Sequence, residues 1–85
     1  MSFIDPEIMT TLLGDLNSLG GIPVRESLVF TQYNCSAMTV QSQATLRLHL
    51  QHAKDKGWAD YLCDDFDRAK KWFITPEGKA VLSNR

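Results

Sequence analysis

The chain has 85 residues, 44% of them hydrophobic and 22% charged, and its net charge at pH 7 is −1. This size predicts one small domain, residues 1–85, with a single hydrophobic core. Nine basic residues against ten acidic ones argue against general binding to polyanions, which draws its affinity from Lys and Arg contacts with phosphates. A chain with this balance that binds DNA has to gather its basic residues on one face.

The sequence also bears on the cellular setting. No apolar run approaches the ~20 residues that a membrane-spanning helix needs. The opening residues, MSFIDPEIM, lack the basic flank and apolar run of a secretion signal. Two cysteines, Cys35 and Cys63, are too few for a disulfide framework, and we expect both to be small buried side chains. We therefore expect a cytoplasmic protein without a membrane partner.

The first predicted helix begins after Asp5 and ends before Gly20-Gly21. Asp5 can cap the helix, Pro6 fits its first position, and Glu7 favours the positive end of its dipole. Apolar residues then recur at helical spacing and predict a core face: Ile8, Met9, Leu12, Leu16 and Leu19. Leu13 lies at the edge of this stripe, and its surroundings are the candidate contact surface of a homodimer.

A short strand and a second helix are expected next. Pro23 keeps the preceding residue extended, which favours a minor strand at residues 22–24. Residues 25–33 predict a helix, although their β-branched and aromatic side chains would also suit a strand. Residues 34–37 are the expected turn. The residues expected to face inward are Leu28, Val29 or Phe30, and, beneath the turn, Met38 and Val40.

The strongest pattern in the chain lies in residues 42–56, which predict a third helix. Its inward face carries apolar residues spaced four and three apart, namely Leu46, Leu50 and Ala53, with Ser42 and His49 flanking them. Three residues can serve as its N-cap: Ser36, Thr39 and Ser42. Gly57 favours a left-handed cap at its end, after which Trp58 returns to the core.

Two segments rich in aromatic and β-branched residues, 58–62 and 71–75, predict the strands of a hairpin. The core residues expected in it are Trp58 and Trp72. Residues 63–70 (CDDFDRAK) join the strands, and Phe66 at the tip either folds back on the hairpin or contacts a partner.

A closing helix at residues 76–84 is the last predicted element. Thr75-Pro76-Glu77 repeats the device that opens the first helix, with a capping residue, a Pro and an acid. The residues that this helix would partly bury are Ala80, Val81 and Leu82.

The order of these elements resembles that of winged-helix proteins. The residues Thr45-Leu46, Leu50, Ala53 and Lys56-Gly57-Trp58 resemble the family's recognition helix and the turn that follows it. The run Ile74-Thr75-Pro76-Glu77-Gly78-Lys79-Ala80 resembles the strand end and helix start that close many bacterial winged helices. A further likeness, over residues 25–78, is to small winged-helix proteins of Mu-like prophages. The resemblance covers residues 23–82 and implies an α+β winged helix: a three-helix core, a C-terminal β-hairpin wing and a short closing helix.

The resemblance also implies where DNA would bind. In winged-helix proteins the third helix lies in the major groove and the hairpin tip contacts the adjacent backbone or minor groove. Carried over by position, the DNA-binding residues would be Gln43, Thr45, Arg47, Gln51, His52, Lys54, Arg68 and Lys70, with Lys71 at the wing base. Gln and Arg can make bidentate contacts to base edges, whereas Thr can bond a phosphate.

Two departures from the family pattern favour a protein partner instead. Apolar side chains occupy the middle of the face that would meet DNA, and three acids in the wing loop (Asp64, Asp65 and Asp67) offset its basic residues. An exposed apolar stripe marks a protein interface more often than a DNA interface. The alternative interface would consist of Ala44, Leu48 and Phe66.

The sequence gives no catalytic or metal motif. His49 and His52 are three residues apart, a spacing that can hold a metal, but a closed zinc site needs four ligands and no second pair is suitably spaced. A flanking and a solvated histidine are the simpler account. No Ser-His-Asp or Cys-His-Asn set and no Gly-rich phosphate loop can be assembled. We therefore expect no catalysis, no metal and no cofactor.

Taken together, the sequence predicts a small non-catalytic DNA-binding protein, a transcriptional or phage/prophage regulator that uses its third helix and wing. A homodimer would double the phosphate contacts available to so weakly charged a monomer. The alternative is a winged helix that serves as a protein–protein interaction module without specific DNA binding.

Overall fold

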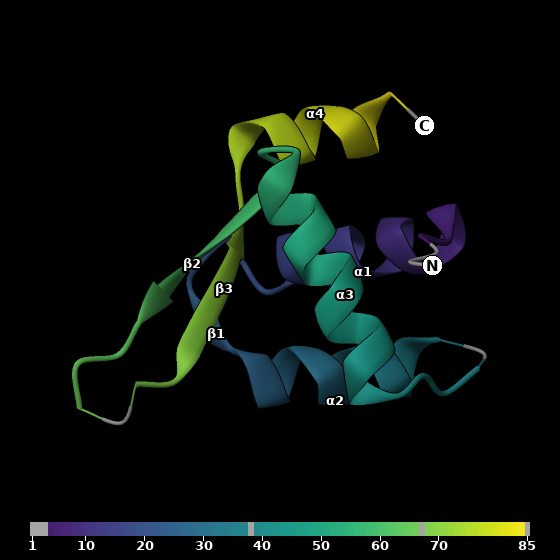
Figure 1. Ribbon diagram of the computed structural model, residues 1–85. Helices are drawn as coiled ribbons and strands as arrows, with labels where there is room; N and C mark the ends of the chain where they lie inside the picture. The colour runs from purple at the N-terminus through teal and green to yellow at the C-terminus, as the bar shows by residue number, and fades with distance from the viewer. Residues whose placement is uncertain (1–3, 38, 67, 85) are drawn as a thin grey trace.

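The computed structural model describes residues 4–37, 39–66 and 68–84. Its elements follow the order α1 (Pro6–Ser18), β1 (Val24–Arg25), α2 (Glu26–Ser36), α3 (Gln43–Asp55), β2 (Ala59–Cys63), β3 (Lys70–Ile74) and α4 (Pro76–Ser83). Figure 1 shows α3 crossing in front of α1, with α2 and α4 at opposite ends and the β2–β3 hairpin projecting to one side. The α+β architecture and the order of its elements are as the sequence predicts.

Helix α1 forms the centre of the helical layer. It begins as predicted: the Asp5 carboxylate accepts a hydrogen bond of 2.8 Å from the backbone N–H of Glu7, and Pro6 opens the first turn. Leu13 is only 1% exposed, so the prediction that its surroundings form a dimer surface is wrong. The reason is that α1 packs against α2, α3, α4 and β3, which together cover more of the helix than its apolar stripe indicated.

Helix α2 is one turn longer than predicted, because residues 34–36 continue the helix instead of forming a turn. The Ser36 hydroxyl accounts for the extension, since it donates to the Asp15 carboxylate on α1 at 3.1 Å. Burial raises the pKa of the Asp15 carboxyl, and the bond from Ser36 acts in the opposite direction. A contact between residues this far apart in the chain ties the last turn of α2 to α1.

The inward face of α2 also differs in part from the prediction. Val29 and Phe30 are buried, as expected, and Tyr33 joins them one turn later. Leu28, in contrast, is 51% exposed, because a helix that buries residues 29, 30 and 33 turns residue 28 away. Val40, expected beneath the turn, is exposed, and Met38 lies outside the described residues.

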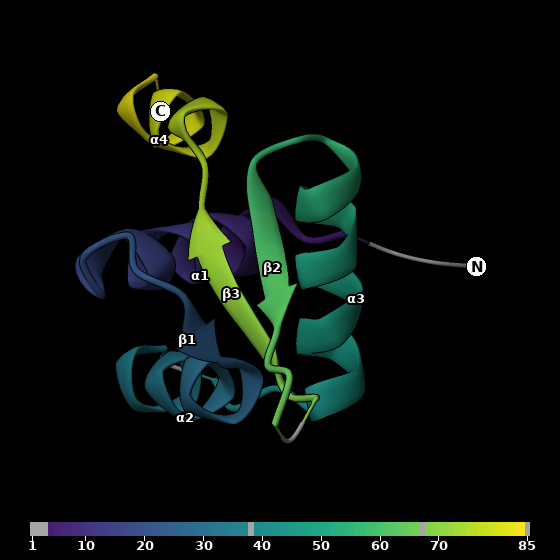
Figure 2. The same ribbon diagram turned by 90° about the vertical axis from the view of Figure 1, so that its left-hand side faces the viewer.

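The three strands form one antiparallel sheet in the order β1–β3–β2 (Figure 2). Trp72, in the middle strand, is paired with Val24 on one side and Tyr61 on the other. Its side chain is 1% exposed, as predicted, and its indole N–H donates to the Glu26 carboxylate at 3.2 Å. Trp58, just before β2, packs against the core but is only partly buried.

Helix α4 closes the fold against the base of the hairpin. The Thr75 hydroxyl accepts a hydrogen bond from the Gly78 N–H (3.1 Å) and donates one to the Gly57 carbonyl (2.6 Å). A Cβ added at Gly78 would collide with the carbonyl oxygen of Trp58, so the absence of a side chain lets α4 approach this segment. Ala80 is exposed, contrary to prediction, because it lies on the outer side of this short helix. Val81 and Leu82 pack against the core.

Candidate nucleic-acid interface

Helix α3 is anchored as its apolar spacing predicts. The side chains of Leu46, Leu50 and Ala53 are at most 1% exposed. Of the three possible N-caps, the structure uses Ser42, whose hydroxyl oxygen accepts a hydrogen bond of 3.2 Å from the Thr45 N–H. The helix therefore presents one fixed face inward and the opposite face outward, beside the hairpin (Figure 1).

His49 does not flank the core but lies within it, at 1% exposure. Its Nε2 accepts a hydrogen bond of 2.9 Å from the backbone N–H of Asp5, so its Nδ1 carries the proton and donates to the Thr45 carbonyl at 2.8 Å. Both ring nitrogens are thus occupied by backbone groups, which leaves neither for DNA or a metal. The described part of the chain also contains no group of three potential metal-ligating side chains.

The outward face of α3 is open to solvent. Its exposed side chains are Gln43, Ala44, Arg47, Leu48, Gln51 and Asp55. Two residues named by the prediction are less free than expected: the Thr45 hydroxyl accepts a hydrogen bond from Ser42 at 3.0 Å, and His52 is partly buried with its ring edge-on to Trp58 at 6.1 Å. Gln51 donates to Asp55 at 3.1 Å, within one turn of the helix.

Arg47 is held over the start of α2. Its Nε lies 3.3 Å from the Glu26 carboxylate, and its guanidinium carbon lies 5.7 Å from the centroid of the Phe30 ring. The Arg47 side chain is nevertheless 53% exposed, while that of Glu26 is 18% exposed. Glu26 therefore bridges two parts of the site, because its other oxygen accepts from the Trp72 indole.

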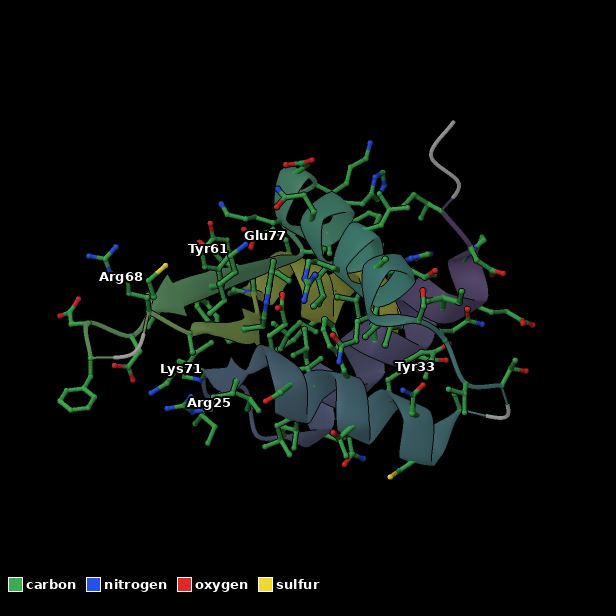
Figure 3. The ribbon with its side chains drawn as sticks, turned by 60° about the horizontal axis from the view of Figure 1, so that its bottom comes forward. Arg25, Tyr33, Tyr61, Arg68, Lys71 and Glu77 are labelled. Carbon is green, nitrogen blue, oxygen red and sulfur yellow. The ribbon has the colours of Figure 1, made fainter. Side chains whose placement is uncertain are left out.

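Tyr61 connects α3 to the wing. The ammonium nitrogens of Lys54 on α3 and Lys70 on β3 lie 5.4 Å and 4.9 Å from the centroid of its ring. The ring itself packs against Trp72, with centroids 4.9 Å apart. Figure 3 shows Tyr61 and Arg68 on one side of the hairpin, with Lys71 and Arg25 on the other. Two of the predicted basic residues, from different elements, thus meet over one aromatic side chain.

The wing loop turns Phe66 outward. Asp64 shapes the loop: its side chain accepts from the Phe66 N–H (2.8 Å), its carbonyl accepts from the Arg68 N–H (2.7 Å), and its N–H donates to the Ala69 carbonyl (2.9 Å). Phe66 is 99% exposed, so it does not fold back on the hairpin. Arg68 is exposed and has φ of 59°, and Asp67 lies outside the described residues.

Acidic residues lie close to most of the predicted basic residues. Lys54 pairs with Asp60 at 3.4 Å and Lys71 with Asp64 at 2.9 Å, in addition to the Arg47–Glu26 pair. The Lys54–Asp60 pair is the most open of the three, and exposed pairs contribute about 0–1 kcal/mol, so a phosphate could replace Asp60 at little cost. The face is therefore closer to neutral than its basic residues alone would make it.

Two features of the site were not expected from the sequence: the acids Glu26 and Asp60, and the ring of Tyr61. Nothing in the sequence marks Glu26 or Asp60 as part of the site. Each is an ordinary acid in the sequence, and only the fold places it beside a basic residue. Tyr61 could have been found, since strand pairing sets it opposite the core residue Trp72 and near the third helix.

Cys35 and Cys63 are exposed, contrary to the expectation of burial, because both lie at the outer ends of their elements.

Comparison with known proteins shows similarity of fold but not of sequence. No protein-family model and no curated protein matches the chain. A PadR-family transcription regulator from Clostridium difficile R20291 superposes with a TM-score of 0.78 at 17% identity, over 91% of this chain and 80% of that one. A proposed DNA-binding protein from Ralstonia eutropha JMP134 gives 0.67 at 22% identity, over 96% of both chains.

The Bordetella bronchiseptica protein BpsR, whose DNA binding is regulated by 6-hydroxynicotinic acid, gives a TM-score of 0.69 at 20% identity, over 95% of this chain and 59% of that one. In the described residues, no helix has the length and apolar character that crossing a membrane requires. With the third helix packed on the core and the hairpin beside it, the chain has the winged-helix fold seen in a PadR-family regulator.

Proposed function

We propose that the chain is a non-catalytic DNA-binding regulator that reads DNA with the outward face of α3 and contacts the backbone with the base of the wing. The observation that carries this proposal is the meeting of Lys54 and Lys70 over Tyr61. It brings a lysine of the helix and a lysine of the hairpin to one aromatic ring, where both could contact the same phosphate backbone. The regulators and DNA-binding proteins of the same fold support this function.

The residues divide by the contacts they would make. Arg47 and Gln51 occupy the part of α3 that would face base edges, where their side chains can make bidentate contacts. The residues suited to phosphates are Lys54, Lys70 and Arg68, with Gln43, Thr45 and His52 at the margin of the helix. Of these, Thr45 and His52 would contribute least, because the structure already engages their side chains.

Binding to DNA would require Arg47 to exchange Glu26 for a nucleic-acid group. Glu26 keeps its hydrogen bond from Trp72, so it would not become a buried unpaired charge when Arg47 leaves. Because Arg47 has to leave Glu26, we expect a single copy of the chain to bind DNA weakly. In a homodimer, each copy would bind one half-site. Action in the cytoplasm and the kinship with Mu-like prophage proteins remain predictions from the sequence.

The proposal is tested by fluorescence anisotropy with a duplex selected from a random pool. Arg47→Ala should weaken binding roughly 10- to 100-fold, since a bidentate base contact discriminates by about 1–3 kcal/mol. Glu26→Gln, which retains an acceptor for Trp72 but removes the charge, should strengthen binding severalfold. Lys79→Ala removes an exposed charge from α4 and serves as the matched control, with affinity expected within twofold.

Affinity should also fall steeply with salt in the wild-type protein. A selected duplex that binds Arg47→Ala and Lys79→Ala equally well would contradict the proposed use of α3. Circular dichroism of each variant separates loss of binding from loss of the fold.

A second function, a protein-interaction module, is favoured by one observation. Phe66 is 99% exposed and Leu48 36% exposed, so apolar groups are available on both the wing and α3. In that case Leu48→Glu should abolish capture of the partner, whereas the chain should bind DNA only weakly and without sequence preference.

A further inference from the structure

A groove on the side of the molecule away from the wing lies between the start of α1, the end of α2 and the segment before α3. Its volume is about 580 Å³, within the range of pockets that hold small molecules. Most of the lining residues are polar, but about half of the wall is apolar surface, to which Ile8 and Ala37 contribute. The DNA-binding proposal uses none of these residues.

Tyr33 on α2 lines this groove with an unused hydroxyl. The residue is only 4% exposed, yet within the described part of the chain its hydroxyl makes no hydrogen bond. Every completely enclosed side-chain nitrogen or oxygen in that part of the chain has a hydrogen-bond partner. The Tyr33 oxygen must therefore remain accessible, and the groove is the opening that reaches it. Figure 3 shows Tyr33 on α2, remote from the hairpin.

The groove is electrostatically negative. Asp5 and Glu7 contribute carboxylates to its wall, and Asp15 lies behind Ser36. Among the residues that the structure describes, no Lys, Arg or His lines it. Burial raises the pKa of the Tyr33 hydroxyl, and the charges of Asp5, Asp15 and Glu7 raise it further. The N-terminus of α1 offers about half a positive charge, which the two carboxylates of the wall exceed.

We propose that this groove binds a small organic cation, an amine or amidine with a short apolar body. Its charged N–H groups would donate to the Asp5 and Glu7 carboxylates and to the Tyr33 oxygen, while its body would contact Ile8 and Ala37. Such a ligand supplies donors to acceptors that the protein leaves open, and its charge matches that of the wall. One Asp5 carboxylate oxygen accepts from the Glu7 N–H, and the other has no hydrogen-bond partner among residues 4–37, 39–66 and 68–84.

The test is a ¹⁵N–¹H NMR titration of the full chain with benzamidine, which needs no DNA and is independent of the proposed function. Benzamidine should shift the backbone amides around the groove and saturate with a dissociation constant of roughly 1–10 mM, as expected for so small a ligand. Benzamide, a neutral molecule of the same shape, should cause no saturable shift.

Two variants locate the site. Glu7→Gln and Tyr33→Phe should each weaken benzamidine binding at least threefold, and Tyr33→Phe should fold normally because the lost hydroxyl has no partner in the described residues. Glu77→Gln is the matched control, because Glu77 follows a capping residue and Pro76 at the start of α4 just as Glu7 follows Asp5 and Pro6. It should leave the affinity unchanged.

Three results would overturn the proposal. One is equal binding of benzamide and benzamidine, and another is an equal loss of affinity in Glu7→Gln and Glu77→Gln. The third is a shift of the amide resonances around the groove that follows the protein concentration and not the benzamidine concentration. A second copy of the chain would then occupy the groove.

Discussion

Helix α3 and the wing hairpin differ in how firmly the fold holds their outward side chains. Along α3, an inward row of buried residues fixes the helix, and Arg47 and Lys54 are each oriented by an aromatic ring and a carboxylate. In the hairpin, the base is fixed by Trp72, but Phe66 at the tip extends into solvent from a loop shaped by Asp64. The outward basic side chains of α3 are therefore held in place by the fold, whereas the Phe66 ring at the wing tip is open to solvent.

Leu50→Ala should have the largest effect, because it removes the anchor of α3. Truncating a fully buried Leu costs about 2–5 kcal/mol, a large share of the stability of a small domain. Urea denaturation should show the loss directly. Leu48→Ala, on the outward face of the same helix, is the control and should change the free energy of unfolding by less than about 1 kcal/mol. Similar losses in both variants would show that α3 is not held by one face.

Gly78→Ala should have an intermediate effect and tests the base of the hairpin. The added Cβ has no room against the Trp58 carbonyl, so we expect a loss of about 1–3 kcal/mol as α4 moves away. Gly14→Ala makes the same substitution inside α1, where nothing lies within 4 Å of the new atom, and should stabilise by about 0.5–1 kcal/mol. Thermal melts of the two variants should therefore move in opposite directions. A shift of the same sign would refute the close approach at Gly78.

Phe66→Ala should have the smallest effect on stability, within about 0.5 kcal/mol, because the ring buries almost no surface in the isolated chain. Urea denaturation checks this expectation. Destabilisation by more than 1 kcal/mol would mean that the ring packs on the protein in solution, and the wing tip would then be no freer than α3.

Local patterns were enough to predict much of this fold. The apolar spacing of Leu46, Leu50 and Ala53 gave the inward face of α3, and the two Pro-containing starts gave the caps of α1 and α4. Strand composition located the hairpin to within about a residue. These features depend on neighbours in the chain, so the sequence displays them directly.

The errors have a common physical origin in contacts between distant residues. The extra turn of α2 depends on Ser36 and Asp15, and the burial of His49 depends on the backbone of Asp5. In the candidate interface, the exposure of Arg47 and Gln51 followed from helical geometry. The acids that pair with Arg47 and Lys54 come from other elements, so the charge balance of the surface could not be predicted from α3 alone.

The two hydrogen bonds of the His49 ring make that side chain a natural spectroscopic reporter. With Nδ1 protonated and Nε2 accepting, its ring ¹⁵N resonances should show one tautomer, the form that is the minority in free histidine. The Asp5 amide that bonds to it should exchange slowly with solvent for as long as the beginning of the chain stays docked on α3. A single imidazole can therefore monitor the attachment of the first helix without any added label.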